Sequence, residues 1–363
     1  MEDGQFTLIL KDGYPLDDTL EVAGLLGNST ALIAGWILPE RGLLDLPALA
    51  HAMFLEEYSI ALLPDRNIVS RMAEIAREGQ PRKRDKTTET AMRMMAFAQA
   101  VDWDIDPGLA FHELAQKQGN EAAWDELAWF RTADETAVQS WLDLALGRAS
   151  NISLGSAKER ECLDFAGDLQ RWTRNYIVTL KIAELELGPL APIDKFYSLA
   201  NWMVDGFIVA GPALLFAARY WGTCGNRAGM IKKLQSPNRD RAIEGCANAA
   251  WDITYLSLFA LRIPKGEEAN RRYILATCDE LLAEIAPYVM YGPERIDNLP
   301  SLAEGMLKWW GQKDAEKIAK RMLETQEIGR SGRLVGANSG DDPIPAMIQQ
   351  GENIVRAWPG TSP

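Results

Sequence analysis

The sequence has few of the residues that bind zinc. Only 4 cysteines and 2 histidines occur among its 363 residues. The cysteines lie far apart and give no metal-ligand spacing, so we do not expect a zinc site. The start of the chain also lacks a basic segment followed by an apolar one, which is the pattern of a secretory signal. We therefore expect a reduced, cytoplasmic protein. The cysteines are Cys162, Cys224, Cys246 and Cys278.

No apolar run in the sequence is long enough to span a bilayer. The most apolar segment, residues 206–218, is too short and is interrupted by Gly211 and Pro212. We predict a helix buried in protein there, and no membrane partner.

Several catalytic and phosphate-binding motifs are also absent. The sequence contains no G-x-x-x-x-G-K-[ST] loop and no G-x-G-x-x-G that follows a strand. It contains no G-x-S-x-G elbow, and two histidines leave little room for a hydrolytic triad. Nucleotide-dependent enzymes and serine hydrolases are therefore poor matches to this sequence.

Basic residues are fewer than acidic ones, 38 against 51, which gives a formal net charge of −13 at pH 7. This argues against a broad surface for nucleic acid but permits a local basic patch. The densest basic stretch follows Pro81 and is either a solvated loop or, for a nucleic-acid substrate, a loop that contacts phosphates. Its basic residues are Arg82, Lys83, Arg84 and Lys86.

What the chain does contain is typical of a globular protein, with 47% apolar and 25% charged residues. Its length favours two domains. Residues 120–235 have an almost wholly helical pattern, including one long helix expected over 159–186. Tryptophans at helical spacing in this region indicate core packing.

Two apolar segments each end in a carboxylate at the start of a helix. Residues 59–63 lead to Asp65, and residues 273–277 lead to Asp279. Such an aspartate can be a helix cap and no more. It can also mark the end of a strand, where α/β folds hold ligands and catalytic groups. Asp104, Asp106 and Asp134 can supplement such a site, although the sequence pattern ties none of them to a strand end.

Two further carboxylates lie in apolar helical segments. Glu113 follows a short strand expected within residues 102–106, and Asp252 has apolar neighbours on nearly every side. A buried carboxylate is costly unless it is paired or binds a metal ion. Four converging carboxylates would repel one another, and a hard divalent cation such as Mg²⁺ or Mn²⁺ is their natural partner. The simpler alternative for Glu113 is an outward-facing position on its helix.

In order and type, the four acidic segments resemble those of PIN-domain-like ribonucleases. The resemblance covers roughly residues 58–115 and 240–292. It implies a parallel sheet between helices, with the acids gathered at its carboxyl edge. It also implies that Asn67 supports the metal site or its waters. The metal ligands and catalytic residues that the resemblance implies are Asp65, Glu113, Asp252 and Asp279.

The predicted fold class is therefore α/β, with a PIN-like core formed by residues 58–115 and 240–292. We expect an N-terminal extension over 1–57, a large all-helical insertion over 116–239, and a helical C-terminal region with a glycine-rich linker over 293–363. The expected function is divalent-metal-dependent hydrolysis of RNA. The alternative is a non-enzymatic interaction or scaffold protein with a degenerate core. A homo-oligomer or a protein partner would then use the helical insertion.

Overall fold

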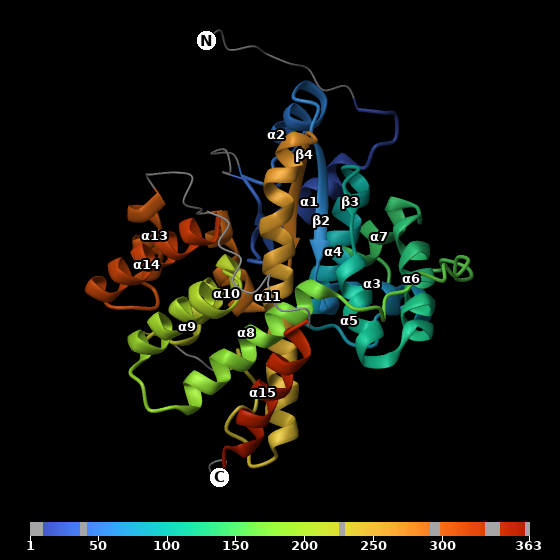
Figure 1. Ribbon diagram of the computed structural model, residues 1–363. Coiled ribbons are helices and arrows are strands. Elements are labelled where there is room, and N and C mark those ends of the chain that lie inside the picture. Colours follow the sequence, from blue (N-terminus) through green and yellow to red (C-terminus); the bar gives the residue numbers. More distant parts are fainter. Residues whose placement is uncertain (1–9, 37–41, 225–228, 291–297, 331–341, 360–363) are drawn as a thin grey trace. The chain divides into compact units, whose positions relative to one another are not determined.

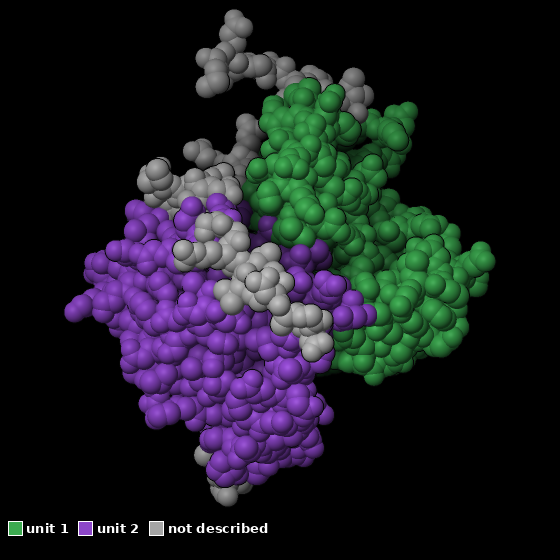
Figure 2. Space-filling model, in the orientation of Figure 1, with its two compact units in different colours: residues 1–167, 261–283 green, residues 168–260, 284–363 purple. Residues whose placement is uncertain are grey.

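The computed structural model describes residues 10–36, 42–224, 229–290, 298–330 and 342–359. The chain forms two compact units, which Figure 2 distinguishes by colour. Unit 1 comprises residues 1–167 and 261–283, and unit 2 comprises residues 168–260 and 284–363. Residues 116–167 thus belong to unit 1 and residues 240–260 to unit 2, so the units cut across the ranges predicted from the sequence.

Unit 1 is built on a four-stranded mixed sheet with the strand order β1-β4-β2-β3; Figure 1 labels β4, β2 and β3. Strand β2 (Ser59–Pro64) runs parallel to both β4 (Arg271–Ala276) and β3 (Asp104–Ile105). Strand β1 (Leu32–Ala34) pairs with β4 in the antiparallel direction. The α/β class is confirmed, but the sheet is not wholly parallel, because the N-terminal region supplies an edge strand of opposite direction.

The sequence of β2 explains its central position. Ile60, Ala61, Leu62 and Leu63 are each at most 3% exposed, so side chains on both faces of the strand are buried. A continuous apolar run of this kind is typical of a parallel strand covered by helices. The register places Leu62 opposite Ile274 of β4.

Amphipathic helices supply the rest of the core of unit 1. In α3 (Arg66–Glu78), Ile68, Val69, Met72 and Ile75 are buried at helical spacing. The helix ends at Gly79, whose φ of 71° is a left-handed conformation that glycine adopts without strain. The other helices of unit 1 are α1 (Leu16–Gly27), α2 (Leu46–Ala50), η1 (His51–Leu55), α4 (Lys86–Ala100), α5 (Gly108–Gln118), α6 (Asn120–Asp134) and α7 (Val138–Ala145).

The helix expected over residues 159–186 begins later than predicted. Helix α8 spans Gln170–Leu187, and residues 148–169 are not helical. The backbone N–H of Gly167 donates to the side chain of Asp164 at 3.0 Å. Local side-chain bonds of this kind compete with helix formation, and glycine adds to the cost.

In the part that the structure describes, the regular elements of unit 2 are all helices. Phe196, Trp221, Phe259, Trp309 and Trp310 are at most 1% exposed and form its core. Its elements are α8, α9 (Pro192–Gly206), α10 (Gly211–Tyr220), α11 (Arg239–Glu268) up to Ala260, η2 (Ala286–Met290), α13 (Asn298–Met306), α14 (Gln312–Arg330) and α15 (Ile344–Ala357); α12 (Glu280–Ile285) begins in unit 1.

The most apolar segment of the chain forms part of this core. Residues 213–218 of α10 are all buried, as predicted. Within the described ranges, no helix has both the length and the apolar composition needed to cross a bilayer.

Candidate functional site

Asp65 lies directly after β2 and caps helix α3. Its Oδ1 accepts the backbone N–H of Ile68 at 3.0 Å, which satisfies one of the free donors in the first turn of the helix. Its Oδ2 accepts the hydroxyl of Thr277 at 2.6 Å. The residue is 4% exposed. Asp65 is therefore both a helix cap and a buried carboxylate at the carboxyl end of the central strand.

The environment of Asp65 favours the protonated form of its carboxyl more than water does. Burial, with a smaller contribution from the negative charges of Glu113 and Asp279, raises the pKa of its carboxyl to about 6, although the hydrogen bonds from Thr277 and Ile68 act in the opposite direction. The carboxylates of Glu113 and Asp279 are thus near enough to Asp65 to repel it. Glu113 and Asp279, which are far from Asp65 in the sequence, therefore act electrostatically on it within unit 1.

Asp279 follows β4 and caps the next helix. Its Oδ1 accepts the backbone N–H groups of Leu281 and Leu282 at 2.9 and 3.0 Å. Its own backbone N–H donates to the Thr277 hydroxyl oxygen at 3.0 Å. Thr277 therefore bonds to both strand-end aspartates, and its side chain is 1% exposed.

Glu113 reaches this group from helix α5. The residue is 9% exposed, so it does not take the outward-facing position that was the simpler alternative. Its Oε1 accepts the ammonium of Lys117, one turn later, at 2.8 Å. This cation offsets part of the repulsion among the three carboxylates.

Another carboxylate lies at the same edge of the sheet. Asp106 directly follows β3, and its backbone N–H donates to the Leu62 carbonyl at 2.8 Å. Its Oδ2 is paired with Arg262 at 3.2 Å. The sequence analysis named Asp106 as a possible supplement to the site but did not tie it to a strand end, because a two-residue strand leaves almost no periodic pattern.

Residues at the start of α4 approach Asp279 and its neighbours. Lys86 Nζ lies 3.1 Å from Oε1 of Glu280, the residue after Asp279. Burial raises the pKa of the Cys278 thiol, while hydrogen bonds from Thr90 and Thr87 act against this shift. We call residues 82–86 the basic loop. Its last residue, Lys86, and the strand-end Asp279 therefore lie in the same region of unit 1.

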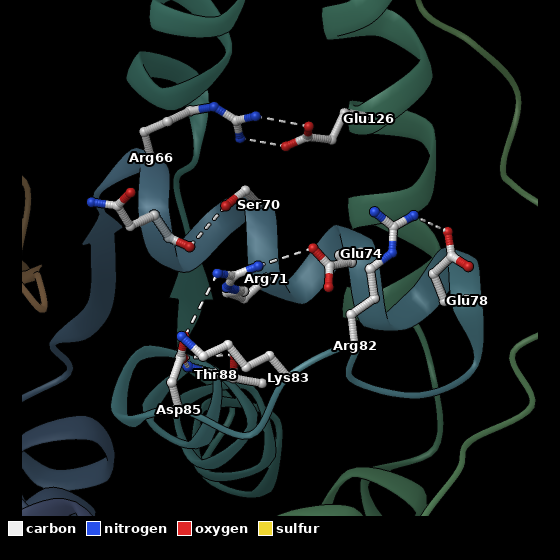
Figure 3. A network of polar contacts seen from close by, with 11 residues as sticks. Arg66, Ser70, Arg71, Glu74, Glu78, Arg82, Lys83, Asp85, Thr88 and Glu126 are labelled. Carbon is white, nitrogen blue, oxygen red and sulfur yellow. Dashed lines mark hydrogen bonds and ion pairs between the residues drawn. The ribbon is translucent and has the colours of Figure 1, made fainter.

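Acidic side chains close to the basic loop neutralise part of its positive charge. Figure 3 shows Arg82 bonded to Glu78 and Lys83 close to Asp85. The Arg82–Glu78 distance is 2.6 Å and the Lys83–Asp85 distance is 3.3 Å. Arg84 is exposed, and no ion pair joins it to any described residue. The same view shows the two bonds between Arg66 and Glu126, one of 2.8 Å, which connect α3 to α6.

Two of the predicted site residues are placed differently. Asn67 is exposed on α3, where its carbonyl accepts the Ser70 hydroxyl at 2.9 Å. Asp252 lies in the part of α11 that belongs to unit 2. It is half-buried between Trp251 and Ile253, which are 3% and 0% exposed, so this stretch of the helix is buried as predicted.

The donor chemistry of the three-carboxylate group, defined as Asp65, Glu113 and Asp279, fits a hard divalent cation. All of its ligating atoms would be oxygens, which Mg²⁺ and Mn²⁺ prefer. In the described part of the chain, no three His, Cys, Asp or Glu side chains stand in a ready metal-binding arrangement. Binding would therefore require side-chain adjustment, and Glu113 would exchange Lys117 for the metal ion.

Comparisons of the chain with protein-family models, with curated proteins and with solved structures give no match.

Proposed function

We propose that this protein is a divalent-metal-dependent ribonuclease with a PIN-like core. One observation carries the proposal. A buried carboxylate at the end of the central parallel strand, Asp65, has a raised pKa and shares its surroundings with Glu113 and Asp279. The carboxyl ends of parallel strands are where α/β folds place ligands, and perturbed pKa values gather at functional sites.

A group of this kind is costly unless something binds to it. Burial and mutual repulsion both disfavour the charged form of Asp65, and one lysine offsets only Glu113. A bound Mg²⁺ or Mn²⁺ ion would activate a water molecule and neutralise charge on the departing oxygen of a phosphodiester. Asp65, Glu113 and Asp279, which all belong to unit 1, would hold it.

The neighbourhood of the group supports an anionic polymer as the substrate. Carboxylates alone would repel RNA, so cations are needed at the rim of the site. Lys86, beside Glu280, and Arg84, which is exposed, lie at or next to the start of α4. In this proposal they contact phosphates and do not read sequence, together with Arg82 and Lys83.

The test is cleavage of labelled single-stranded RNA during titration with Mn²⁺. We expect Asp65→Asn and Asp279→Asn to lose activity by at least about a hundredfold, because a neutral amide is a poor ligand for a hard cation. Asp45→Asn is the matched control. Asp45 also caps a helix, accepting the Ala48 N–H at 2.8 Å, but it is outside the three-carboxylate group.

The outcomes separate the alternatives. Equal Mn²⁺-dependent activity in Asp65→Asn and in the wild type would overturn the proposal. If the wild type neither cleaves RNA nor binds Mn²⁺, the non-enzymatic scaffold alternative is favoured.

A further inference from the structure

An apolar groove of unit 1 lies between α1 and the segment that leads into α2. It has a volume of about 540 Å³. Helix α1 contributes Leu20 and Gly24 to its lining, and the later segment contributes Leu43 and Pro47. Among the described residues that line the groove, Asp45 alone carries a charge. Nothing in the proposed nuclease site uses this groove.

Helix α1 has a second apolar side, which faces solvent. Leu16 and Leu20 are 38% and 48% exposed. At Gly24, one turn after Leu20, an added Cβ atom would meet no other atom within 4 Å. These three positions are four residues apart, so they form one stripe along the helix. The opposite side, which packs in the core, contains the buried residues Thr19, Val22, Ala23 and Leu26.

Exposed apolar side chains continue along the next helix. Residues 46–55 form one continuous helix, whose second half is the π-helix η1. Leu55 lies about two turns after Pro47 and therefore on the same side of this helix. Phe54 and Leu55 are 69% and 57% exposed, more than any other large apolar side chain that the structure describes.

The groove connects these two exposed sides, because Leu20 and Pro47 both line it. Five large apolar side chains are exposed in the described part of unit 1, and four of them lie on α1 and η1. Single exposed apolar residues are ordinary, whereas a concentration of them marks an interaction site. We call this region the α1–η1 surface and define it by Leu16, Leu20, Leu43, Pro47, Phe54 and Leu55.

The surroundings of the α1–η1 surface are acidic. Residues 10–36 and 42–58 contain seven Asp and Glu residues and one lysine, which is about half of the net charge of −13. Cations from elsewhere in unit 1 pair with only two of these acids, Asp18 with Arg148 and Glu56 with Arg272. No described residue forms an ion pair with the other five. These are Asp12, Asp17, Glu21, Asp45 and Glu57.

Two of these acids run beside the apolar stripe of α1. Asp17 and Glu21 each follow one of the exposed leucines by one position, and both are exposed. They are four residues apart, so they form an acidic stripe next to the apolar one. A partner with apolar side chains between basic ones would match both stripes.

We infer that the α1–η1 surface binds a basic amphipathic helix of a partner protein. The apolar side of that helix packs in the groove and against Leu20 and Phe54, as in other complexes of a helix with a groove. Its Lys and Arg side chains, on either side of the apolar ones, pair with Asp17, Glu21 and Glu57. A second copy of this surface or an anionic membrane would be repelled by the same acids.

The experiment measures fluorescence anisotropy of a labelled peptide of about 18 residues, long enough for five helical turns. The peptide has Leu at positions i, i+3, i+4 and i+7 and Lys elsewhere, and it is titrated with the full chain. EDTA is present, so the proposed metal site does not contribute. One control peptide has the same composition in an order without an apolar side, and another has Glu in place of Lys.

We expect the amphipathic Lys peptide to bind at least about tenfold more tightly than either control, because only it matches both the apolar groove and the acidic stripe. Its binding should weaken as salt is added. Absence of binding by this peptide, or equal binding of the reordered peptide, would overturn the inference.

An apolar double variant locates the binding surface. Leu20→Ser with Phe54→Ser should weaken peptide binding by at least about tenfold, because central apolar contacts dominate such interfaces. The matched control is Leu163→Ser with Leu190→Ser, which replaces two leucines that are 47% and 42% exposed outside the surface. This control should change binding by less than about twofold. Equal effects of the two double variants would overturn the inference.

A charge variant tests the acidic stripe independently of the apolar contacts. Neutralising Asp17, Glu21 and Glu57 as Asn, Gln and Gln should weaken binding and flatten its salt dependence. The control replaces three exposed glutamates of α14 by Gln and removes the same number of charges. They are Glu316, Glu324 and Glu327. An equal loss of affinity in both triple variants would show attraction to the net charge alone and would overturn the inference.

Two further measurements test the other occupants. A wild-type dimer in sedimentation that Leu20→Ser with Phe54→Ser abolishes would assign the surface to a second copy and overturn the inference. Binding to vesicles of phosphatidylcholine and phosphatidylserine that the same variant abolishes would assign it to a membrane, with the same consequence. We expect neither result.

Discussion

The hydroxyl of Thr277 donates to the carboxylate of Asp65 at 2.6 Å, joining the ends of strands β4 and β2. The same oxygen accepts the backbone N–H of Asp279. A single buried side chain thus fixes the position of one strand-end carboxylate relative to the other. Thr277 is a positioning residue in the proposed site, and it is the group that sequence reasoning missed most completely.

Thr277→Val should destabilise the protein by about 1–3 kcal/mol, because it leaves a buried carboxylate without one of its donors. It should also raise the pKa of Asp65 further, since the Thr277 bond lowers that pKa in the wild type. Urea unfolding measures the first effect. Thr277→Ser keeps the hydroxyl and is the control. Equal stability of the valine and serine variants would contradict this role.

Stability should depend on the ionisation of Asp65. Its pKa is raised from 3.8 to about 6 in the folded state, so the folded state binds the proton more tightly than the unfolded state. The stabilising contribution of the protonated carboxyl is complete below about pH 4 and is lost as the pH rises through about 6, a change on the order of 2–3 kcal/mol.

The Asp65→Asn variant has no titratable group at this position. Comparing its stability with that of the wild type therefore isolates the contribution of Asp65 to the pH dependence. The free energy of unfolding of the wild type, minus that of the variant, should fall between about pH 4 and pH 6. Asp134, which has a similarly raised pKa, is present in both proteins and cancels in the difference. A difference that does not change with pH would show that Asp65 has an ordinary pKa.

The basic loop should bind RNA through its positive charge and should not discriminate among RNA sequences. Replacing Arg82, Lys83, Arg84 and Lys86 by Ala should weaken binding similarly for every RNA and flatten its salt dependence. Filter binding at several salt concentrations, with catalysis prevented by EDTA, measures both quantities. Metal affinity should not change. An unchanged salt slope would mean that the loop is solvated surface only.

Substitution of single residues in this loop should reduce RNA affinity by different amounts. Arg82 is 2.6 Å from Glu78, whereas the structure describes no ion pair for Arg84. Arg84→Ala should therefore reduce RNA affinity more than Arg82→Ala, because Arg82 must first leave its partner. The same binding assay tests this, and an equal effect of both substitutions would contradict the expected order.

The bidentate pair between Arg66 and Glu126 should contribute to the packing of α3 on α6. The two side chains are 19% and 16% exposed, so the pair is partly shielded from solvent. We expect a coupling energy of about 1–2 kcal/mol from a double-mutant cycle using Arg66→Met and Glu126→Gln. The exposed pair of Lys158 and Glu135 is the control and should couple by less than about 1 kcal/mol. Equal coupling in the two cycles would contradict this expectation.

Local patterns in the sequence were enough to predict part of the fold. The apolar run of β2 and the Asp65 cap that follows it are local features, and both are present as expected. That β2 and β4 belong to one sheet was expected from two similar strand-to-helix segments, whereas their direct pairing was not predicted. The direction of β1 was not predicted either, because a three-residue strand does not reveal its partner.

The candidate site was harder to predict than the strands that carry it. That Glu113 approaches Asp65 depends on how α5 packs, which no local pattern encodes. Thr277 looked like an ordinary strand residue, since its hydroxyl has a role only once two distant strands pair.

The position of β4 also has a consequence for synthesis of the protein on the ribosome. β4 lies between β1 and β2, and the chain makes both of these strands long before it makes residues 271–276. Neither early strand can reach its β4 partner while the intervening helices emerge. During most of translation, the nascent chain must therefore keep two apolar strands from pairing with other strands or chains. The sheet is completed late and slowly, because its contacts join residues that are distant in sequence.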